Sequence, residues 1–301
     1  MLKDIPIFLY DKLVKQYGEE LTKKIIDGYT RKRMVTLRVN RLKTTSEEVK
    51  TILSNNGIKF EGVKWSNEAL IIKNADENDI RKLEIYDRGE IYLQSLSSMI
   101  PAIVLNPLED ENILDMAAAP GGKTTQMAAL SENKAMITAC EKNRIRADRL
   151  KYNIEKQGAT RVNVMLEDAR NLNDLFSFDK ILLDAPCSGS GTLNLESETV
   201  FKYFTEELIK RSVKTQAQLL DKAVKVLKKG HEMVYSTCSI LEEENENNVQ
   251  RILKNKGLEI VPIDESQFEG ATLLPSQIKG TICVCPNELY EGFFIAKIRK
   301  V

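Results

Sequence analysis

Between residues 112 and 237, short apolar runs alternate with longer amphipathic stretches. The runs have the length of buried strands, and the longer stretches repeat their apolar side chains with the period of a helix. Because parallel strands must be joined by crossovers, this alternation predicts a doubly wound, mostly parallel α/β sheet. The expected strands are 112–115, 135–140, 162–166, 180–184 and 233–236, with a closing strand at 293–297. The helix before residue 233 is expected to end at Gly230, since glycine commonly terminates helices.

The first 88 residues have a different character, and we expect a small N-terminal α/β module over 1–88 and a larger domain over 89–301. The expected elements of the module are a helix over 5–29, strands near 36–40, 58–60 and 69–72, and a helix that follows the capping box at 45–48 and stops at Gly57. A helix over 95–105 is expected to open the larger domain, and Pro101 can break or restart it.

Composition excludes several classes of protein. The chain has 44 Lys and Arg residues against 44 Asp and Glu residues, so nucleic-acid binding would need local basic patches. The single histidine, His231, excludes a His-based metal cage and disfavours a Ser-His-Asp triad. Five scattered cysteines without an export signal predict reduced thiols in a cytoplasmic protein. No apolar run approaches the roughly 20 residues that span a bilayer. We expect a monomer with no metal and no membrane segment.

Acidic residues or a glycine-rich turn follow four of the expected strands. Asp115 opens the turn at 115–124, and Glu141, Asp168 and Asp184 follow the next three strands. Ligands of open α/β sheets gather at the carboxyl ends of the strands, and an acid about 20 residues after a glycine-rich turn suits a ribose diol. The alternative is that these acids cap helices, but four in register favour a nucleoside-containing ligand.

A phosphate-binding P-loop is a rival interpretation of the same turn, because Gly122, Lys123 and Thr124 resemble its end. That loop needs a glycine where this chain has Ala117. Pro120 also removes a backbone N–H donor that a phosphate cradle uses. The turn therefore favours a ligand other than a nucleoside triphosphate.

Two cysteines follow neighbouring expected strands, Cys187 after 180–184 and Cys238 after 233–236. Both thiols should lie at the ligand edge of the sheet, although a free cysteine is often only a small buried apolar residue. Residues 239–242 have the pattern of a capping box, which predicts a helix beginning beside Cys238. A helix N-terminus lowers a thiol pKa, whereas the acidic residues 242–244 would oppose that shift.

The motifs resemble those of the Sun/Fmu-type (Nol/Nop/Sun) RNA 5-methylcytosine methyltransferases. The three most specific segments are DMAAAPGGKT at 115–124, DAPCSGSG at 184–191 and YSTCS at 235–239. Further similar segments are LRVN at 37–40, QSLSSM at 94–99, EENE at 243–246 and EGFF at 291–294. The resemblance covers nearly the whole chain and implies a Rossmann-like methyltransferase sheet with a small RNA-binding module.

The resemblance also implies S-adenosylmethionine as cofactor and a role for each motif residue. The cofactor would be lined by Ala117, Ala118, Ala119, Pro120, Gly121, Gly122 and Lys123, with Glu141 at the ribose, Asp168 at the adenine, and Asp184 at the methionine end or the target base. Cys238 would be the nucleophile, and Cys187 would assist release of the product.

The chemistry of cytosine methylation requires such a set of groups. C5 of cytosine is too weakly nucleophilic to take a methyl group directly, but addition of a thiolate at C6 makes C5 enamine-like. Loss of the C5 proton and expulsion of the thiolate then restore the aromatic ring, a step that a second thiol can assist. Asp184 could stabilise N3–H or the amino group of the ring, with Lys123 as electrostatic support.

A basic cluster in the module suggests the partner. No acidic residue lies between Gly28 and Ser46, a segment that contains Arg31, Lys32, Arg33, Arg38, Arg41 and Lys43. We expect the first four of these basic residues to contact structured RNA, either rRNA or tRNA. A solvated charged face is the alternative. Two other functions stay open: a methyltransferase for DNA or a small molecule, and a non-catalytic RNA-binding assembly factor with the same fold.

Overall fold

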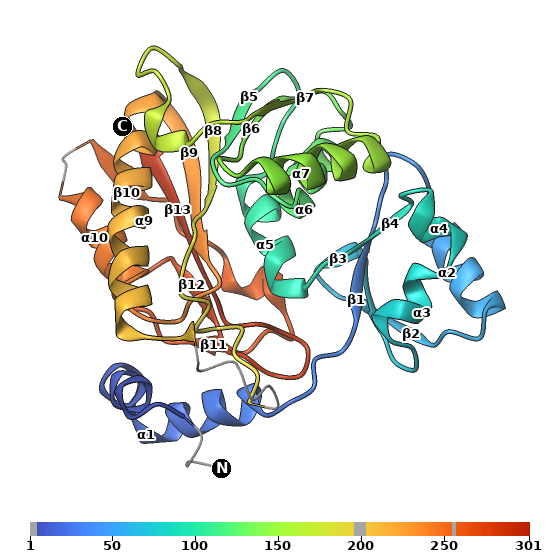
Figure 1. Ribbon diagram of the computed structural model, residues 1–301, viewed down its shortest axis with the longest axis horizontal. Helices are drawn as coiled ribbons and strands as arrows, with labels where there is room; N and C mark the ends of the chain where they lie inside the picture. Colours follow the sequence, from blue (N-terminus) through green and yellow to red (C-terminus); the bar gives the residue numbers. More distant parts are fainter. Residues whose placement is uncertain (1–4, 196–202, 255–256) are drawn as a thin grey trace.

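A computed structural model describes residues 5–195, 203–254 and 257–301 of the chain (Figure 1). Its larger sheet runs in the order β11-β12-β13-β9-β8-β5-β6-β7, and β10 pairs with β13. Strands β5 to β9 pair with one another in parallel. Strands β10 to β13 pair antiparallel with one another, and β13 also pairs antiparallel with β9. Chain order reverses between β5 and β8, which is where such sheets bind ligands. The strands are β5 (Asn112–Asp115), β6 (Met136–Cys140), β7 (Val162–Met165), β8 (Phe178–Asp184), β9 (Leu227–Thr237), β10 (Leu258–Ile260), β11 (Leu273–Leu274), β12 (Ile282–Val284) and β13 (Phe293–Lys300).

Helices cover both faces of this sheet, as expected for a doubly wound fold. Alternate strand residues point to opposite faces, so Ile181 and Leu183 of β8 join one apolar core and Leu182 joins the other. Helices α1, α9 and α10 complete the first core, and α5, α6 and α7 complete the second. The helices are α1 (Ile7–Tyr29), α5 (Leu96–Leu105), α6 (Gly122–Leu130), α7 (Arg144–Gln157), α9 (Glu206–Val226) and α10 (Glu246–Leu253), with short 3-10 turns η2 (Ala169–Asn171) and η3 (Glu265–Phe268).

A second, antiparallel sheet forms the N-terminal module, with strand order β2-β3-β1-β4 and its own apolar core. Its elements are β1 (Thr36–Val39), α2 (Ser46–Asn55), β2 (Phe60–Val63), β3 (Ser66–Ile72), α3 (Glu77–Arg81), α4 (Glu84–Asp87) and β4 (Ile91–Leu93). Helix α1 precedes this sheet in the chain but lies away from it, against the larger domain (Figure 1). Within residues 1–88, the module that packs around its own core therefore starts after α1.

Four local predictions differ from the structure. The N-terminal helix is interrupted at Gly18, which has φ 74° and ψ 168°. Pro101 lies inside α5 without ending it. Helix α9 ends at Val226, not at Gly230, because Leu227 turns extended and pairs with Phe178. No helix starts at residue 239 either, since the next helix, α10, begins at Glu246.

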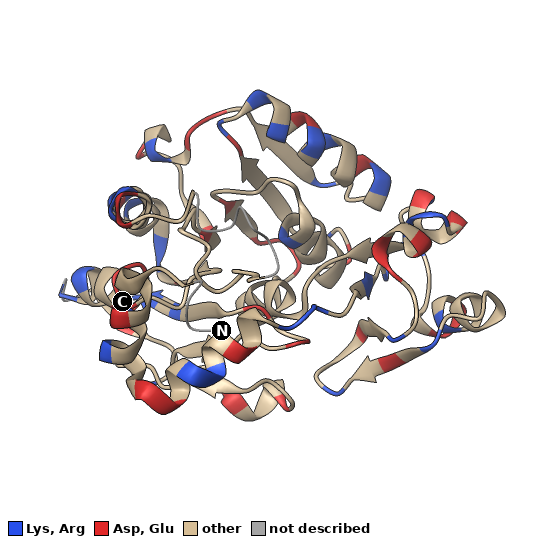
Figure 2. Ribbon diagram, turned by 60° about the horizontal axis from the view of Figure 1, so that its bottom comes forward, with Lys and Arg blue, Asp and Glu red and all other residues tan. Residues whose placement is uncertain are grey.

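Basic and acidic positions are intermingled along most helices, in keeping with the balanced composition (Figure 2). None of the described helices is long and apolar enough to cross a membrane. The described part of the chain also contains no group of three or more His, Cys, Asp or Glu side chains placed to hold a metal ion. All five cysteines are free thiols.

Candidate active site

The glycine-rich turn connects β5 to α6 at the point where the strand order reverses. Asp115 ends β5 and is buried, and its Oδ2 accepts a hydrogen bond of 2.7 Å from Thr124 Oγ1. Burial raises the pKa of Asp115 to about 6. Gly121 has φ 109°, and a Cβ on it would lie 2.9 Å from Cδ1 of Leu150. The position therefore favours glycine, which lets the turn pass close to α7.

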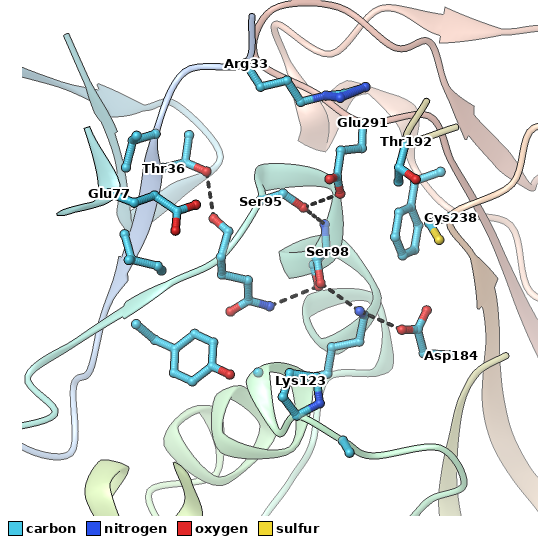
Figure 3. A pocket seen from close by; sticks show the side chains of 18 of the residues that line it. Arg33, Thr36, Glu77, Ser95, Ser98, Lys123, Asp184, Thr192, Cys238 and Glu291 are labelled. Carbon is cyan, nitrogen blue, oxygen red and sulfur yellow. Dashed lines mark hydrogen bonds and ion pairs between the residues drawn. The ribbon is translucent and has the colours of Figure 1, made fainter. Parts of the chain in front are cut away.

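A cavity of about 610 Å³ opens at this edge of the sheet (Figure 3). Its wall combines the turn with the ends of β8 and β9 and with residues of the N-terminal module, among them Arg33 and Tyr92. Of the expected cofactor residues, those that line it are Ala117, Ala118, Ala119, Pro120, Gly122, Lys123 and Asp184. The cavity thus joins both parts of the chain in one site.

Lys123 and Asp184 form an ion pair in the cavity, with 2.8 Å between Nζ and Oδ2. The lysine also donates to Ser98 Oγ at 2.7 Å (Figure 3). Oδ1 of the aspartate accepts from Ser236 Oγ at 2.8 Å. Nζ of Lys123 lies 5.2 Å from the ring centre of Phe293. These contacts fix a cation, an anion and an aromatic ring within one cavity.

The two thiols lie at the same edge of the sheet, and their Sγ atoms are 3.2 Å apart, a contact that the sequence analysis did not specify. Cys238 lines the cavity, whereas Cys187 is not among the residues of its wall. The hydrogen bond with Cys238, followed by burial, raises the pKa of Cys187 well above its usual value. The expectation that Cys238 sits at a helix N-terminus is wrong, because residues 239–241 are irregular and residues 242–245 form turns before α10.

Glu141 and Asp168 lie in a second, smaller pocket that shares Ala117 with the main cavity. Glu141 is buried, and its Oε1 accepts from the backbone N–H of Asn143 at 2.8 Å. Asp168 caps the turn at 169–171 and pairs with Arg170 at 2.6 Å, which lowers the pKa of the aspartate. Glu141 also pairs with Arg146 at 3.4 Å, so both expected nucleoside ligands lie beside the turn and each is already paired with an arginine.

The basic cluster is only partly available to a phosphate. Arg38 is 3% exposed and donates to Gln94 and Thr125, so its guanidinium is already engaged within the protein, and an RNA contact at Arg38 stays a prediction. Arg31 is exposed but makes a two-point contact with Asp27, one turn earlier in α1. Lys32 is exposed, and Arg33 reaches the cavity wall.

Several residues of the cavity were not assigned a role from the sequence. Ser98 and Phe293 contact Lys123, and Glu291 accepts from Ser95 Oγ at 2.7 Å. All of them lie in the segments 94–99 and 291–294, which resemble the family's motifs. The resemblance therefore marked these segments as important but did not predict the contacts with Lys123 or between Ser95 and Glu291. Tyr92 lies outside the motif segments, so nothing in the sequence pointed to it.

Comparison with known proteins establishes the family. A family model described as 16S rRNA methyltransferase RsmB/F matches residues 102–299, and one described as the ferredoxin-like domain of RsmF/B-like methyltransferases matches residues 5–78. The chain belongs to the RsmB/F methyltransferase family, which confirms the resemblance found in the sequence and the expected fold.

Individual relatives agree with this assignment. Ribosomal RNA small subunit methyltransferase F of Shewanella loihica is 36% identical over 88% of this chain and 56% of its own length. The tRNA (cytosine(72)-C(5))-methyltransferase of Pyrococcus horikoshii is 40% identical over 74% of this chain and 55% of its own. The structure of NSun6 from the same archaeon with SFG superposes with a TM-score of 0.87 at 27% identity, covering all of both chains. The chain thus spans little more than half the length of these two curated relatives.

Proposed function

We propose that the protein is an S-adenosylmethionine-dependent RNA (cytosine-5) methyltransferase that acts through a covalent bond between Cys238 and C6 of cytosine. The observation that carries the proposal is the placement of the Cys238 thiol in one cavity with the Lys123–Asp184 pair, 3.2 Å from a second thiol. The two curated relatives are named as a ribosomal RNA methyltransferase and a tRNA methyltransferase. The name of the tRNA enzyme specifies C5 of a cytosine as its target. A non-catalytic assembly factor is not favoured by these names.

The two adjoining pockets fit a cofactor with a nucleoside at one end and a charged amino acid at the other. Glu141 can accept from a ribose hydroxyl, and the turn at 117–123 separates this position from Asp184. Asp168 can accept from an adenine amine only by sharing an oxygen with Arg170. When bound, S-adenosylmethionine supplies an electrophilic methyl group.

The chain's own residues would carry the remaining chemistry. Cys238 reaches the cavity and can form the bond to C6, while Asp184 can accept a hydrogen bond from N3–H or the amino group of the ring. Because its pKa is raised, Cys187 keeps its proton near neutral pH. At the release step a protonated Cys187 can give its proton to the leaving Cys238 sulfur, and the thiolate that this leaves on Cys187 can accept the proton lost from C5.

Structured rRNA or tRNA is the substrate class that we propose. We also propose that the chain divides at residue 88 into an N-terminal module and a methyltransferase domain. In the module, the sheet β1–β4 and the preceding segment 30–35 would contact RNA. Within the described residues, Nε of Arg33 is buried and has no hydrogen-bond partner, and Arg33 lines the cavity. A phosphate or base oxygen at the cavity mouth would satisfy this group.

Methylation of total RNA in vitro tests the proposed function directly. The protein is incubated with labelled S-adenosylmethionine and RNA from a strain that lacks the gene, and the product is mapped by bisulfite sequencing. We expect label at C5 of one or a few cytosines in rRNA or tRNA, and none with the Cys238→Ala variant. Label at another base, or in DNA or a small molecule alone, would refute the proposal.

Replacement of Glu141 should weaken cofactor binding selectively. Glu141→Ala leaves the ribose hydroxyls of the bound cofactor without their acceptor, which costs about 1–3 kcal/mol, or roughly 5- to 150-fold in Kd. It also removes the partner of the Asn143 N–H and of Arg146 in the free protein. Calorimetry with S-adenosylmethionine measures the change, and Asp148→Ala, an exposed acid on α7, is the control. An unchanged Kd would remove Glu141 from the cofactor site, and tight binding of ATP–Mg²⁺ instead would support the P-loop alternative.

Charge reversal in the basic cluster should weaken RNA binding without affecting the cofactor. If Arg31, Lys32 or Arg33 binds a phosphate, reversing its charge should reduce the slope of log K against log salt by roughly 0.7–0.9. We expect the smallest change at Arg31, which is already paired with Asp27. Lys24→Glu, at an exposed site on α1, is the control. A slope that stays the same in all three variants would make the cluster a solvated face.

A further inference from the structure

Glu244 is a fully buried carboxylate between the two loops that carry the thiols. Its Oε1 accepts from the backbone N–H of Ser188 at 2.7 Å and from Gln216 Nε2 at 3.1 Å. Its Oε2 accepts from Ser188 Oγ at 2.5 Å and from Ser239 Oγ at 2.6 Å. Ser188 follows Cys187 and Ser239 follows Cys238, so one side chain holds the neighbour of each thiol.

The two loops are joined at their far ends by other contacts. The N–H of Gly191 donates to the carbonyl of Cys238 at 3.0 Å, and the hydroxyls of Ser190 and Ser239 lie 2.8 Å apart. At the near end, beside Cys187, Glu244 is the hydrogen-bond acceptor for the Ser188 N–H among the described residues. On the other side of Cys187, the Ala185 N–H donates to the Ser236 carbonyl at 2.8 Å and Gln216 Nε2 donates to the Pro186 carbonyl at 3.0 Å. Glu244 is therefore the contact that holds the loop directly after Cys187.

The surroundings of Glu244 indicate a structural acceptor, not an ion pair or an acid–base group. Four donors surround its carboxylate, and the described residues give it no lysine or arginine partner within 4.0 Å. Burial raises the pKa of Glu244, and the hydrogen bonds from Ser188 and Ser239 oppose that shift. Glu244 is not among the residues that line the cavity, so it has no direct route to substrate.

We propose that Glu244 is a positioning residue that fixes the distance between the Cys187 and Cys238 thiols. The proposal rests on the proposed function, in which Cys187 assists release of Cys238 from the methylated base. The rate of a reaction between two positioned groups falls when one of them is displaced by about 1 Å, so proton transfer between the two thiols depends on their distance. Loss of the Ser188 anchor should therefore slow the release step while leaving Cys238 able to attack.

The contacts predict how two substitutions should differ. Glu244→Ala leaves the Ser188 N–H without its acceptor and frees the loop. Glu244→Gln can keep the Ser188 N–H and Gln216 bonds through its oxygen, while its amide donates to the two serine hydroxyls, which can also accept. A positioning role thus predicts rescue by glutamine, whereas a role that needs the negative charge or a titrating proton predicts that glutamine behaves like alanine.

One readout measures the thiol pair without RNA or cofactor. Diamide, a two-electron thiol oxidant, converts Cys187 and Cys238 into a disulfide and is reduced to the hydrazine, which takes up both thiol protons. The three other cysteines are buried, so mass spectrometry can follow this one disulfide. We expect Glu244→Ala to slow its formation about tenfold or more and Glu244→Gln to remain within about threefold of wild type. The control is Glu243→Ala, because Glu243 lies in the same turn but is partly exposed and pairs with Lys12.

The second readout is the lifetime of the covalent protein–RNA adduct in denaturing gels after one turnover. We expect a lifetime about tenfold longer in Glu244→Ala and near wild type in Glu244→Gln. Ser188→Ala removes only the contact of the hydroxyl with Glu244, so it should shift both readouts about threefold in the same direction as Glu244→Ala. This variant replaces Glu244→Ala as the test if Glu244→Ala does not fold. Unchanged readouts in folded Glu244→Ala, or in Ser188→Ala if that variant is used, would overturn the proposal, as would failure of glutamine to rescue. The diamide result stands even if wild-type protein methylates no RNA, so the two proposals fail separately.

Discussion

We expect Cys238→Ala to abolish methylation and to prevent any covalent protein–RNA adduct, and Cys187→Ala to accumulate an adduct that survives denaturant. This result is expected because the roles differ in time: the nucleophile acts before methyl transfer and the second thiol acts after it. Cys238 lines the cavity, while Cys187 lies behind it at 3.2 Å with a raised pKa. The two thiols thus differ in their access to the cavity, although they occupy similar places in the sequence.

Denaturing gels with RNA and labelled S-adenosylmethionine measure both outcomes at once. The adduct in Cys187→Ala should carry the methyl label, since attack and transfer precede the blocked step. Cys285→Ala, which changes a buried thiol directly after β12, is the matched control and should behave as wild type. An adduct in Cys238→Ala and none in Cys187→Ala would reverse the roles. No adduct in either variant would leave covalent catalysis without support.

Much of the site could be predicted because its residues directly follow buried strands. An apolar run that ends in a polar residue locates both the strand and its carboxyl end, so Asp115, Asp184 and Cys238 could be placed at one sheet edge. The proximity of the two thiols followed in the same way, because β8 and β9 are neighbours with Asp184 opposite Ser236.

The failures arose where contacts distant in sequence decide the outcome. Arg38 alternates with apolar residues in β1, which predicts an exposed side chain on a half-buried strand. The strand lies between β3 and β4, and its arginine is covered by Gln94 and Thr125, 56 and 87 residues further along the chain. Similarly, Ser239 follows the pattern of a helix cap, but its hydroxyl donates to buried Glu244 and no helix begins there.

The second large effect is expected at Asp184. Asp184→Ala removes the proposed acceptor for the cytosine ring and leaves the largely buried Lys123 ammonium without its counter-charge. Removing one such preorganised group typically costs about 10²–10³ in turnover. We expect this loss in kcat measured with RNA and labelled S-adenosylmethionine. The diamide rate of the two thiols should stay close to wild type, because Asp184 contacts Ser236 and Lys123 but neither cysteine.

Asp179→Ala is the matched control, since Asp179 lies near the opposite end of β8 and pairs with Lys228. Its replacement should alter thermal stability slightly and turnover by less than the Asp184 change. Asp184→Asn separates two contributions, because asparagine can retain the Ser236 bond and accept from the base but cannot balance the Lys123 charge. If asparagine restores most of the turnover, hydrogen bonding to the ring dominates; if it does not, the carboxylate charge is required. Near wild-type turnover in Asp184→Ala would exclude this aspartate from the chemical step and leave base activation to Cys238 and Lys123.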